Sequence, residues 1–243
     1  MMLSLVRASR ISAAASACAA ALALFALPSA KADNTYNDSI TSIFGTGGNP
    51  AGGWAAQVDG GLTLALRAKN RTTGTITDDG FSTYTQTAGT IAGGLANWNI
   101  EFSISDPNLT TDGITYQVGF DTDPTAAQSI TWVNALTSGA GDAYGTSATG
   151  NGAGTSSFVT GDTKVQNSEN IEFLGQNPSL PGEYTYYLDA YNSSGVLIDS
   201  DHIQVNVVAA PDASSTLTLG ALSFGFLLLP TVLRRFKLRS GQA

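Results

Sequence analysis

Hydrophobic and polar residues alternate along several short stretches in the middle of the chain. The clearest stretch, residues 98–105, reads WNIEFSIS, with an apolar residue at every second position. Because successive side chains of a β-strand point to opposite faces of a sheet, this spacing predicts a strand with one buried face. Residues 62–69 and 114–120 show the same alternation and predict two further strands.

Turn-forming residues separate these stretches. Asp59-Gly60-Gly61 predicts a hairpin between Trp54–Val58 and the strand at 62–69. Clusters of Gly, Asn, Asp and Ser bound the other segments in the same way. The remaining predictions are short strands and one Gly- and Ser-rich loop: strands at 130–133, 158–160 and 171–174, and a loop at 137–157.

The closing part of this region gives the strongest pair of strands. Residues 184–191 and 197–208 alternate on either side of a predicted turn at 192–195. No stretch between 33 and 210 has the apolar spacing of an amphipathic helix, so an all-β fold, most simply a β-sandwich, is predicted there. The Pro-Gly-Glu-Tyr stretch at 181–184 resembles the final strands of immunoglobulin-like bacterial surface modules, and this resemblance implies a loosely immunoglobulin-like sandwich.

Residues 1–32 have the parts of a secretory signal peptide. Two arginines form a positive n-region, and Ile11–Leu27 is an apolar run. Ala30-Lys31-Ala32 is an A-x-A cleavage site, so we expect signal peptidase to release a mature chain that starts at Asp33. An uncleaved N-terminal anchor is the alternative.

A second apolar run, residues 217–233, has seventeen residues without a charge. As a helix it would reach about 26 Å, slightly less than the hydrocarbon core of a bilayer, which predicts a marginal transmembrane helix. The basic tail at 234–243 would stay on the cytoplasmic side and leave the body outside. The cations of this predicted membrane stop are Arg234, Arg235, Lys237 and Arg239.

A short polar motif before the apolar run completes a three-part signal over residues 211–243. The motif residues are Pro211, Asp212, Ser214, Ser215 and Thr216. Together with the Gly-containing apolar helix and the arginine pair after it, this motif resembles the PEP-CTERM type of sorting signal, in its Pro-Asp variant. The resemblance implies that an exosortase-like membrane peptidase removes the tail, in a Gram-negative bacterium that makes extracellular polysaccharide. A plain single-pass anchor is the alternative.

Charge and cysteine content restrict the possible partners and chemistry of the body. Residues 33–211 hold eighteen Asp and Glu but four Lys and Arg, which gives a net charge of −14. An acidic body repels nucleic acid, so no nucleic-acid partner is expected. The one cysteine, Cys18, lies in the predicted signal peptide, which excludes disulfides, Cys-based zinc sites and Cys nucleophiles from the mature chain.

Catalytic and metal-binding residues have few candidates. His202 is the only histidine, and the strand alternation sends it outward while Asp201 points to the opposite face, which does not favour a Ser-His-Asp triad. Asp121 with Asp123, and Asp78-Asp79, could bind Ca²⁺ through oxygens or act as a glycosidase pair. Turns favour Asp because its side chain bonds to nearby backbone. We therefore expect no enzyme and no cofactor, with Ca²⁺ as the alternative.

Aromatic residues supply the one candidate ligand-binding set. Tyr187 and Tyr191 fall on the outward face of their predicted strand beside Asp189. Outward rings next to a carboxylate can stack on sugars and bond to hydroxyl groups, whereas cross-strand packing is the alternative explanation. The tryptophans are in phase with aliphatic neighbours and are predicted to lie in the core: Trp54, Trp98 and Trp132.

The sequence therefore predicts an exported protein of the cell envelope or extracellular matrix. Its body would be outside the inner membrane, to which the C-terminal helix would anchor it until processing. A structural or interaction role is the first expectation for the body. Binding of an extracellular polysaccharide is the alternative.

Overall fold

The structure is a computed structural model in which residues 35–37, 40–109, 111–136, 141–177 and 180–211 are described. These residues form eleven β-strands, and none of them lies in a helix. None of these ranges therefore supplies a helix with the length and hydrophobicity to cross a bilayer. The predicted signal peptide and its cleavage site, the sorting motif after Pro211, the transmembrane helix and the basic tail lie outside the described residues.

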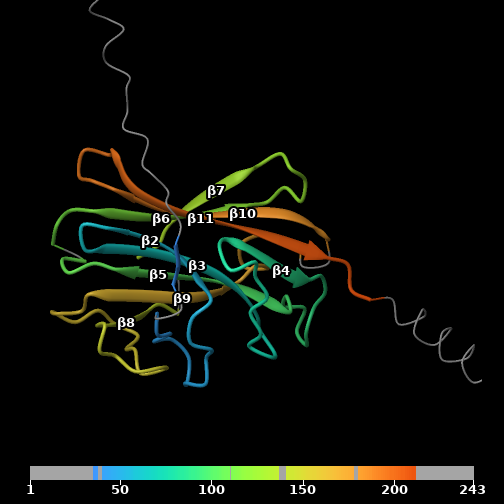
Figure 1. Cartoon of the computed structure of the whole chain (residues 1–243), viewed down its shortest axis with the longest axis horizontal. Coiled ribbons are helices and arrows are strands. Elements are labelled where there is room, and N and C mark those ends of the chain that lie inside the picture. Colours follow the sequence, from blue (N-terminus) through green and yellow to red (C-terminus); the bar gives the residue numbers. More distant parts are fainter. Residues whose placement is uncertain (1–34, 38–39, 110, 137–140, 178–179, 212–243) are drawn as a thin grey trace, which may run out of the picture. The chain divides into compact units, whose positions relative to one another are not determined.

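The strands form two sheets, which Figure 1 shows as two layers. Sheet A has the order β1-β2-β3-β5-β9-β8, with all neighbours antiparallel. Its strands are β1 Thr35–Asn37, β2 Trp54–Asp59, β3 Leu62–Asn70, β5 Trp98–Ser105, β8 Ala143–Gly145 and β9 Lys164–Asn170.

Sheet B has the order β4-β11-β10-β6-β7. Its strands are antiparallel to their neighbours except for the parallel pair β4 and β11. The bounds are β4 Thr83–Thr87, β6 Thr115–Asp121, β7 Ile130–Asn134, β10 Gly182–Tyr191 and β11 Leu197–Val208.

The two sheets face each other through the apolar side of each alternating strand. Leu66 and Phe102 from sheet A belong to the same buried cluster as Val118 and Ile203 from sheet B. The burial of this shared face is the main favourable contribution to folding. The all-β prediction is confirmed, and the two facing sheets agree with a β-sandwich; the immunoglobulin-like topology stays a prediction.

Both predicted hairpins are present. Gly60 and Gly61 alone connect β2 to β3, and both have positive φ angles, as a two-residue type I′ turn requires. β10 and β11 pair along their length, with a register shift at Ala190/Tyr191. In β10 and β11 the alternation also identifies the face that is buried between the sheets, whereas β3 is buried on both faces.

The side of sheet A formed by β9 and β8 differs from the prediction. Residues 158–160 and 171–174 were expected to form strands, but both are turns or irregular segments. The strand is β9, whose sequence KVQNSEN has one apolar residue. Most of its polar side chains are buried, and they form hydrogen bonds with neighbouring polar groups. Apolar alternation therefore does not reveal this strand. The predicted loop at 137–157 contains the edge strand β8.

Residues 40–53 cover part of the outer face of sheet A and create a second, smaller core. Its members are Ile40, Ile43, Phe44, Trp54, Ala56, Ala65 and Ala143. Trp54 is therefore buried as predicted, but outside the inter-sheet core that contains Trp98. As a result, β3 is buried on both faces from Leu64 to Lys69, including its two cations.

Candidate binding surfaces

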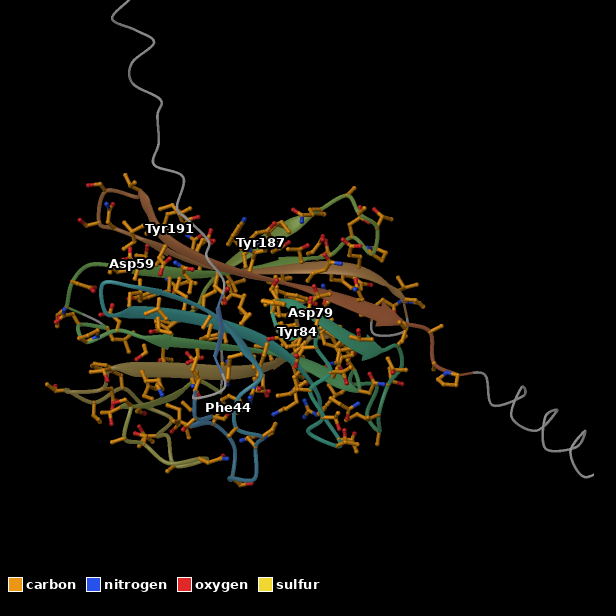
Figure 2. The ribbon with its side chains drawn as sticks, in the orientation of Figure 1. Phe44, Asp59, Asp79, Tyr84, Tyr187 and Tyr191 are labelled. Atoms are coloured by element: carbon orange, nitrogen blue, oxygen red, sulfur yellow. The ribbon has the colours of Figure 1, made fainter. Side chains whose placement is uncertain are left out.

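The predicted tyrosine set divides into two parts on the outer face of sheet B. Figure 2 shows Tyr187 and Tyr191 on the side of the molecule opposite Phe44. The Tyr191 hydroxyl donates to Asp189 Oδ2 at 2.9 Å, and the Ser200 hydroxyl donates to Asp189 Oδ1 at 2.6 Å. Burial, and then this hydrogen bond to Asp189, raises the pKa of Tyr191 to about 12. Asp189 and Tyr191 therefore hold each other, and the buried carboxylate has no oxygen left without a partner.

Tyr187 instead belongs to a row of rings that crosses sheet B. The strand register places Tyr187 beside His202 of β11 and Gly119 of β6, and Gly119 opposite Trp132 of β7. The Tyr187 and His202 rings stack with centroids 5.9 Å apart and planes at 27°. The Tyr187 and Trp132 centroids are 5.8 Å apart, with planes at 41°. We call Trp132, Tyr187 and His202 the aromatic row.

Gly119 makes the row continuous. A Cβ atom at this position would lie 2.7 Å from the Trp132 ring, so the indole rests directly on the glycine backbone. This lets Trp132 reach across β6 toward Tyr187. The prediction that Trp132 is a core residue is wrong, since 41% of its surface is exposed. Trp132 lies on an edge strand whose short sequence, ITWVN, does not show which face is outward.

Polar groups border the row. The Tyr187 hydroxyl donates to Gln128 Oε1 at 3.1 Å, and the Gln128 amide donates to the Thr185 hydroxyl at 3.0 Å. His202 is exposed at the other end of the row. An exposed aromatic surface rimmed by polar groups is typical of an interaction site.

A polar hollow of about 650 Å³ lies on the outer face of sheet A. Residues 44–49, the end of β3, β5, β9 and the turn after β9 contribute to its walls. We call this the polar hollow. The polar and charged residues in its lining are Thr46, Asn49, Lys69, Arg71, Asn99, Asn167, Ser168, Glu169 and Asn170. Phe44 and Phe173 are the two aromatic residues in its lining.

A buried charge network lies beneath the hollow. Glu101 accepts Arg67 Nε on Oε2 at 2.6 Å and Lys69 Nζ on Oε1 at 2.5 Å. Glu101 and Arg67 are both fully buried. Lys69 also donates to Asn49 Oδ1 at 3.1 Å, and Ser168 Oγ donates to Glu101 Oε1 at 2.9 Å. The Glu101 carboxylate therefore forms ion pairs with two cations from the same strand.

Arg67 ties the covering segment to the sheet. Its Nη2 donates to Ser42 Oγ at 2.6 Å, and its Nη1 donates to the Gly52 carbonyl at 2.5 Å. Its guanidinium carbon lies 4.2 Å from the centroid of the Trp54 ring. Arginine is suited to this position because its planar fork presents five donors and also stacks on aromatic faces.

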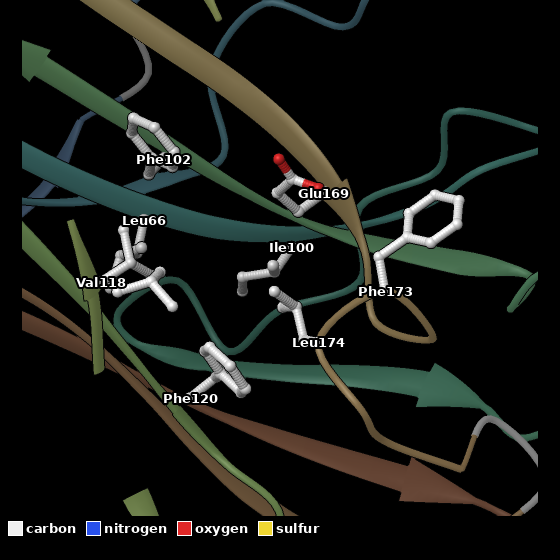
Figure 3. Close-up of a pocket in the computed structure, with 9 residues that line it drawn as sticks. Leu66, Ile100, Phe102, Val118, Phe120, Glu169, Phe173 and Leu174 are labelled. Atoms are coloured by element: carbon white, nitrogen blue, oxygen red, sulfur yellow. The ribbon is translucent and has the colours of Figure 1, made fainter. Parts of the chain in front are cut away.

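A third concave feature lies between the sheets. This apolar cavity has a volume of about 170 Å³. Figure 3 shows Glu169 and Phe173 on one side of it. The rest of its lining comes from Leu66, Ile100, Phe102, Val118, Phe120, Val133 and Leu174. Burial raises the pKa of Glu169, although Asn167 donates a hydrogen bond to it. The cavity is lined by the same kinds of apolar side chain as the core, and Glu169 is the one polar residue among the described residues of its lining.

The aspartates predicted as calcium candidates accept hydrogen bonds from backbone amides and thereby stabilise turns. Asp121 Oδ1 accepts the amides of Asp123 at 3.0 Å and Ser129 at 2.8 Å. Asp78 and Asp79 likewise accept amides of the turn that follows them. In the part of the chain that the structure describes, no group of three or more His, Cys, Asp or Glu side chains is arranged to hold a metal ion.

His202 and Asp201 point to opposite faces of sheet B, as predicted. Asp201 is buried between the sheets, and neither carboxylate oxygen has a hydrogen bond of ordinary geometry. Burial raises its pKa well above the usual value, although the nearby amides of His202 and Leu66 oppose this. Burial also raises the pKa of Asp199 to about 6. This separation gives His202 and Asp201 no shared acid–base site.

Comparison with known proteins adds no family. No protein-family model matches this chain, and a search of curated proteins finds no match. The geometry of the aromatic row and the polar hollow therefore carries the functional argument.

Proposed function

We propose that this chain is an exported interaction protein of the cell surface or extracellular matrix whose β-sandwich binds polysaccharide through the aromatic row. The observation that supports this most is the alignment of Trp132, Tyr187 and His202 across four neighbouring strands, with Gly119 under the indole. Sequence alone indicated only Tyr187 from this row.

The row has the properties that a sugar-binding face needs. Aromatic faces carry partial negative charge, and the C–H groups on the flat side of a sugar ring carry partial positive charge, so the two stack. The cross-strand contacts at 5.8 Å and 5.9 Å hold the rings in place before a ligand arrives. Pre-positioned rings lose less conformational freedom on binding than free side chains do.

The binding proposal is tested by the affinity of the full chain for the polysaccharide of its host. Trp132→Ala and Tyr187→Ala should each weaken binding by about two- to tenfold, because one stacking contact contributes about 0.5–1.5 kcal/mol. Tyr187→Phe keeps the ring and should retain affinity. Phe81→Ala removes an exposed ring outside the row, 66% of whose surface is accessible, and serves as the matched control.

Two results would count against the row. Equal affinity of Trp132→Ala, Tyr187→Ala and the unchanged chain would remove it from binding. Absence of affinity in the unchanged chain would favour the second role, a structural matrix protein that holds its neighbours by protein contacts. Unfolding curves of each variant exclude a loss of fold as the cause.

Export and sorting form a separate part of the proposal. The support is the order of features in the sequence: an A-x-A site at Ala30–Ala32, a polar motif from Pro211 to Thr216, an apolar run and a basic tail. Signal peptidase and an exosortase-like membrane peptidase would be the processing partners. The intact mass of the protein recovered outside the cell should match a chain that starts at Asp33 and lacks residues 217–243. A mass that includes those residues would contradict sorting.

A further inference from the structure

Three of the four cations in the acidic body follow one another along a single strand and the turn after it. Arg67 and Lys69 are in β3, and Arg71 is the first residue after that strand. Because they stand at every second position, they share the outer face of sheet A. The fourth cation, Lys164, lies in β9. This distribution concentrates positive charge at the polar hollow of a body that is otherwise strongly negative.

The charges at the hollow do not cancel. Glu101 is the carboxylate bonded to both Arg67 and Lys69, at 2.6 Å and 2.5 Å. Arg71 is exposed at the rim, and its side chain makes one long hydrogen bond among the described residues, from Nη1 to Asn99 Oδ1 at 3.4 Å. A guanidinium has five N–H donors arranged as a fork, so most of those on Arg71 face outward or into the hollow without a protein acceptor.

Glu169 is the one carboxylate residue among the described residues that line the hollow, and its side chain is held by a neighbour. Asn167 Nδ2 donates to Glu169 Oε1 at 2.6 Å. Asn99 and Asn170 are buried in the wall, and Asn170 Nδ2 donates to Asn99 Oδ1 at 2.9 Å. These bonds fix the side chains that a polar ligand would meet.

An exposed aromatic ring completes the rim. Phe173 lies in the turn after β9, and 69% of its surface is accessible. A cationic fork, fixed amides and an exposed ring within one open hollow match a ligand that carries a carboxylate, hydroxyl groups and an apolar ring face.

We propose that the polar hollow binds a uronic acid residue of an acidic polysaccharide. The sugar carboxylate pairs with the Arg71 guanidinium, and the sugar ring lies against Phe173. This site lies on the outer face of sheet A, whereas the aromatic row lies on the outer face of sheet B. Binding at the hollow does not depend on sugar binding at the row.

The acidic body limits how much of an acidic polymer reaches the site. Charges separated by more than about 8–10 Å are largely screened at physiological ionic strength, so repulsion acts mainly on distant parts of a long polyanion. A short uronate segment can therefore enter the hollow where the local charge is positive. For the same reason, a trisaccharide is a better probe than a polymer.

The test is calorimetric titration of the full chain, purified in mild detergent, with trigalacturonate and with the carboxyl-reduced trisaccharide as its neutral match. The acidic trimer should bind, and the reduced trimer should bind at least about tenfold more weakly, because a charge-assisted bidentate contact is lost. Arg71→Gln should weaken binding of the acidic trimer by a similar factor and leave binding of the reduced trimer unchanged. Phe173→Ala should weaken binding of both.

Three controls make each outcome decisive. Ser194→Asp, in the exposed β10–β11 turn, lowers the net charge by the same one unit and should not change affinity. Trp132→Ala should also have no effect, so a failure of the aromatic row and a failure of this site can be told apart. Triglutamate tests for a plain carboxylate site.

Equal binding of the acidic and reduced trimers, or an Arg71→Gln variant that is folded and binds as the unchanged chain does, would overturn the proposal. Binding of triglutamate as tight as that of trigalacturonate would overturn the assignment to a sugar and indicate an acidic peptide. Circular dichroism melting of Arg71→Gln establishes that the variant is folded.

Discussion

Glu101 is the residue on which the buried charge network depends. It is fully buried and bonded to Arg67 and Lys69, which are also buried. Glu101→Gln removes the negative charge and leaves two cations away from water. We expect the free energy of unfolding to fall by about 3–5 kcal/mol, as for other buried ion pairs that lose one partner.

Urea unfolding followed by tryptophan fluorescence measures this loss. Glu172→Gln is the control, since Glu172 is exposed, and it should change stability by no more than about 0.5 kcal/mol. A Glu101→Gln variant as stable as this control would show that the network contributes little to the fold.

We expect Asp201 and Asp199 to make stability rise as the pH falls, which is the opposite of the usual effect of carboxylates. Burial raises the pKa of Asp201 well above its usual value and raises that of Asp199 to about 6. Between about pH 4 and pH 6 the folded state therefore binds more protons at these groups than the unfolded state does. Their contribution makes the protein more stable as the pH falls through this window, and this contribution is lost as the pH rises through the folded pKa.

Asp201→Asn tests this directly because it removes the charge and keeps the shape. At pH 7 the variant should melt at a higher temperature than the unchanged chain, by about 2–4 °C for each kcal/mol of relieved burial cost. At pH 4 the two should melt at nearly the same temperature. A variant that is less stable than the unchanged chain at pH 7 would show that the Asp201 carboxylate has a stabilising partner.

At the scale of elements, the position of Trp132 in the aromatic row depends on the contact between β7 and Gly119 of β6. A Cβ at Gly119 would meet the Trp132 ring at 2.7 Å, so Gly119→Ala pushes the indole away from Tyr187. Because Trp132 lies at the surface, the ring can move without disturbing the core. We expect affinity for polysaccharide to fall by about two- to tenfold, as one stacking contact is lost, with a change in stability below about 1 kcal/mol.

Titration of Gly119→Ala with the host polysaccharide, beside a thermal melt, measures both effects. Gly150→Ala is the matched change, because a Cβ at Gly150 would meet no atom within 4 Å. Unchanged affinity in Gly119→Ala would mean that the position of Trp132 is not important for binding.

The sequence predicts some of the strands and not others. Strands with one apolar face, such as β5 and β11, were predictable because burial of that face requires period two. β9 was not, because its buried side chains form hydrogen bonds with groups on other strands, as Gln166 Nε2 does when it donates to Ser103 Oγ. Such partners are set by tertiary structure, and a single sequence does not contain them in a local pattern.

The candidate sites were likewise only partly predictable from the sequence. Alternation placed Tyr187 outward, but its neighbours in the row come from β7 and β11, and their proximity depends on strand order and register. The polar hollow needed the covering segment at 40–53 and the β3–β5–β9 order. Alternating cations at Arg67, Lys69 and Arg71 were the available sequence signal for the hollow, and their meaning depends on the burial of the first two.

On the scale of the whole molecule, the two sheets present different chemistry on opposite sides. The outer face of sheet B carries an exposed aromatic row, and the outer face of sheet A carries a cationic, amide-lined hollow. If both proposed sites bind polysaccharide, a β-sandwich with two such faces contacts two segments of one polymer. Linked binding of this kind raises overall affinity beyond that of either site.

The central claim is that the aromatic row is the polysaccharide-binding face. Its most direct test is a heteronuclear NMR titration of the isotope-labelled full chain with fragments of the host polysaccharide. The account predicts that the largest shift changes fall on Trp132, Tyr187 and His202 and on the β6 backbone at Gly119. Shift changes that leave these four residues unaffected would contradict it.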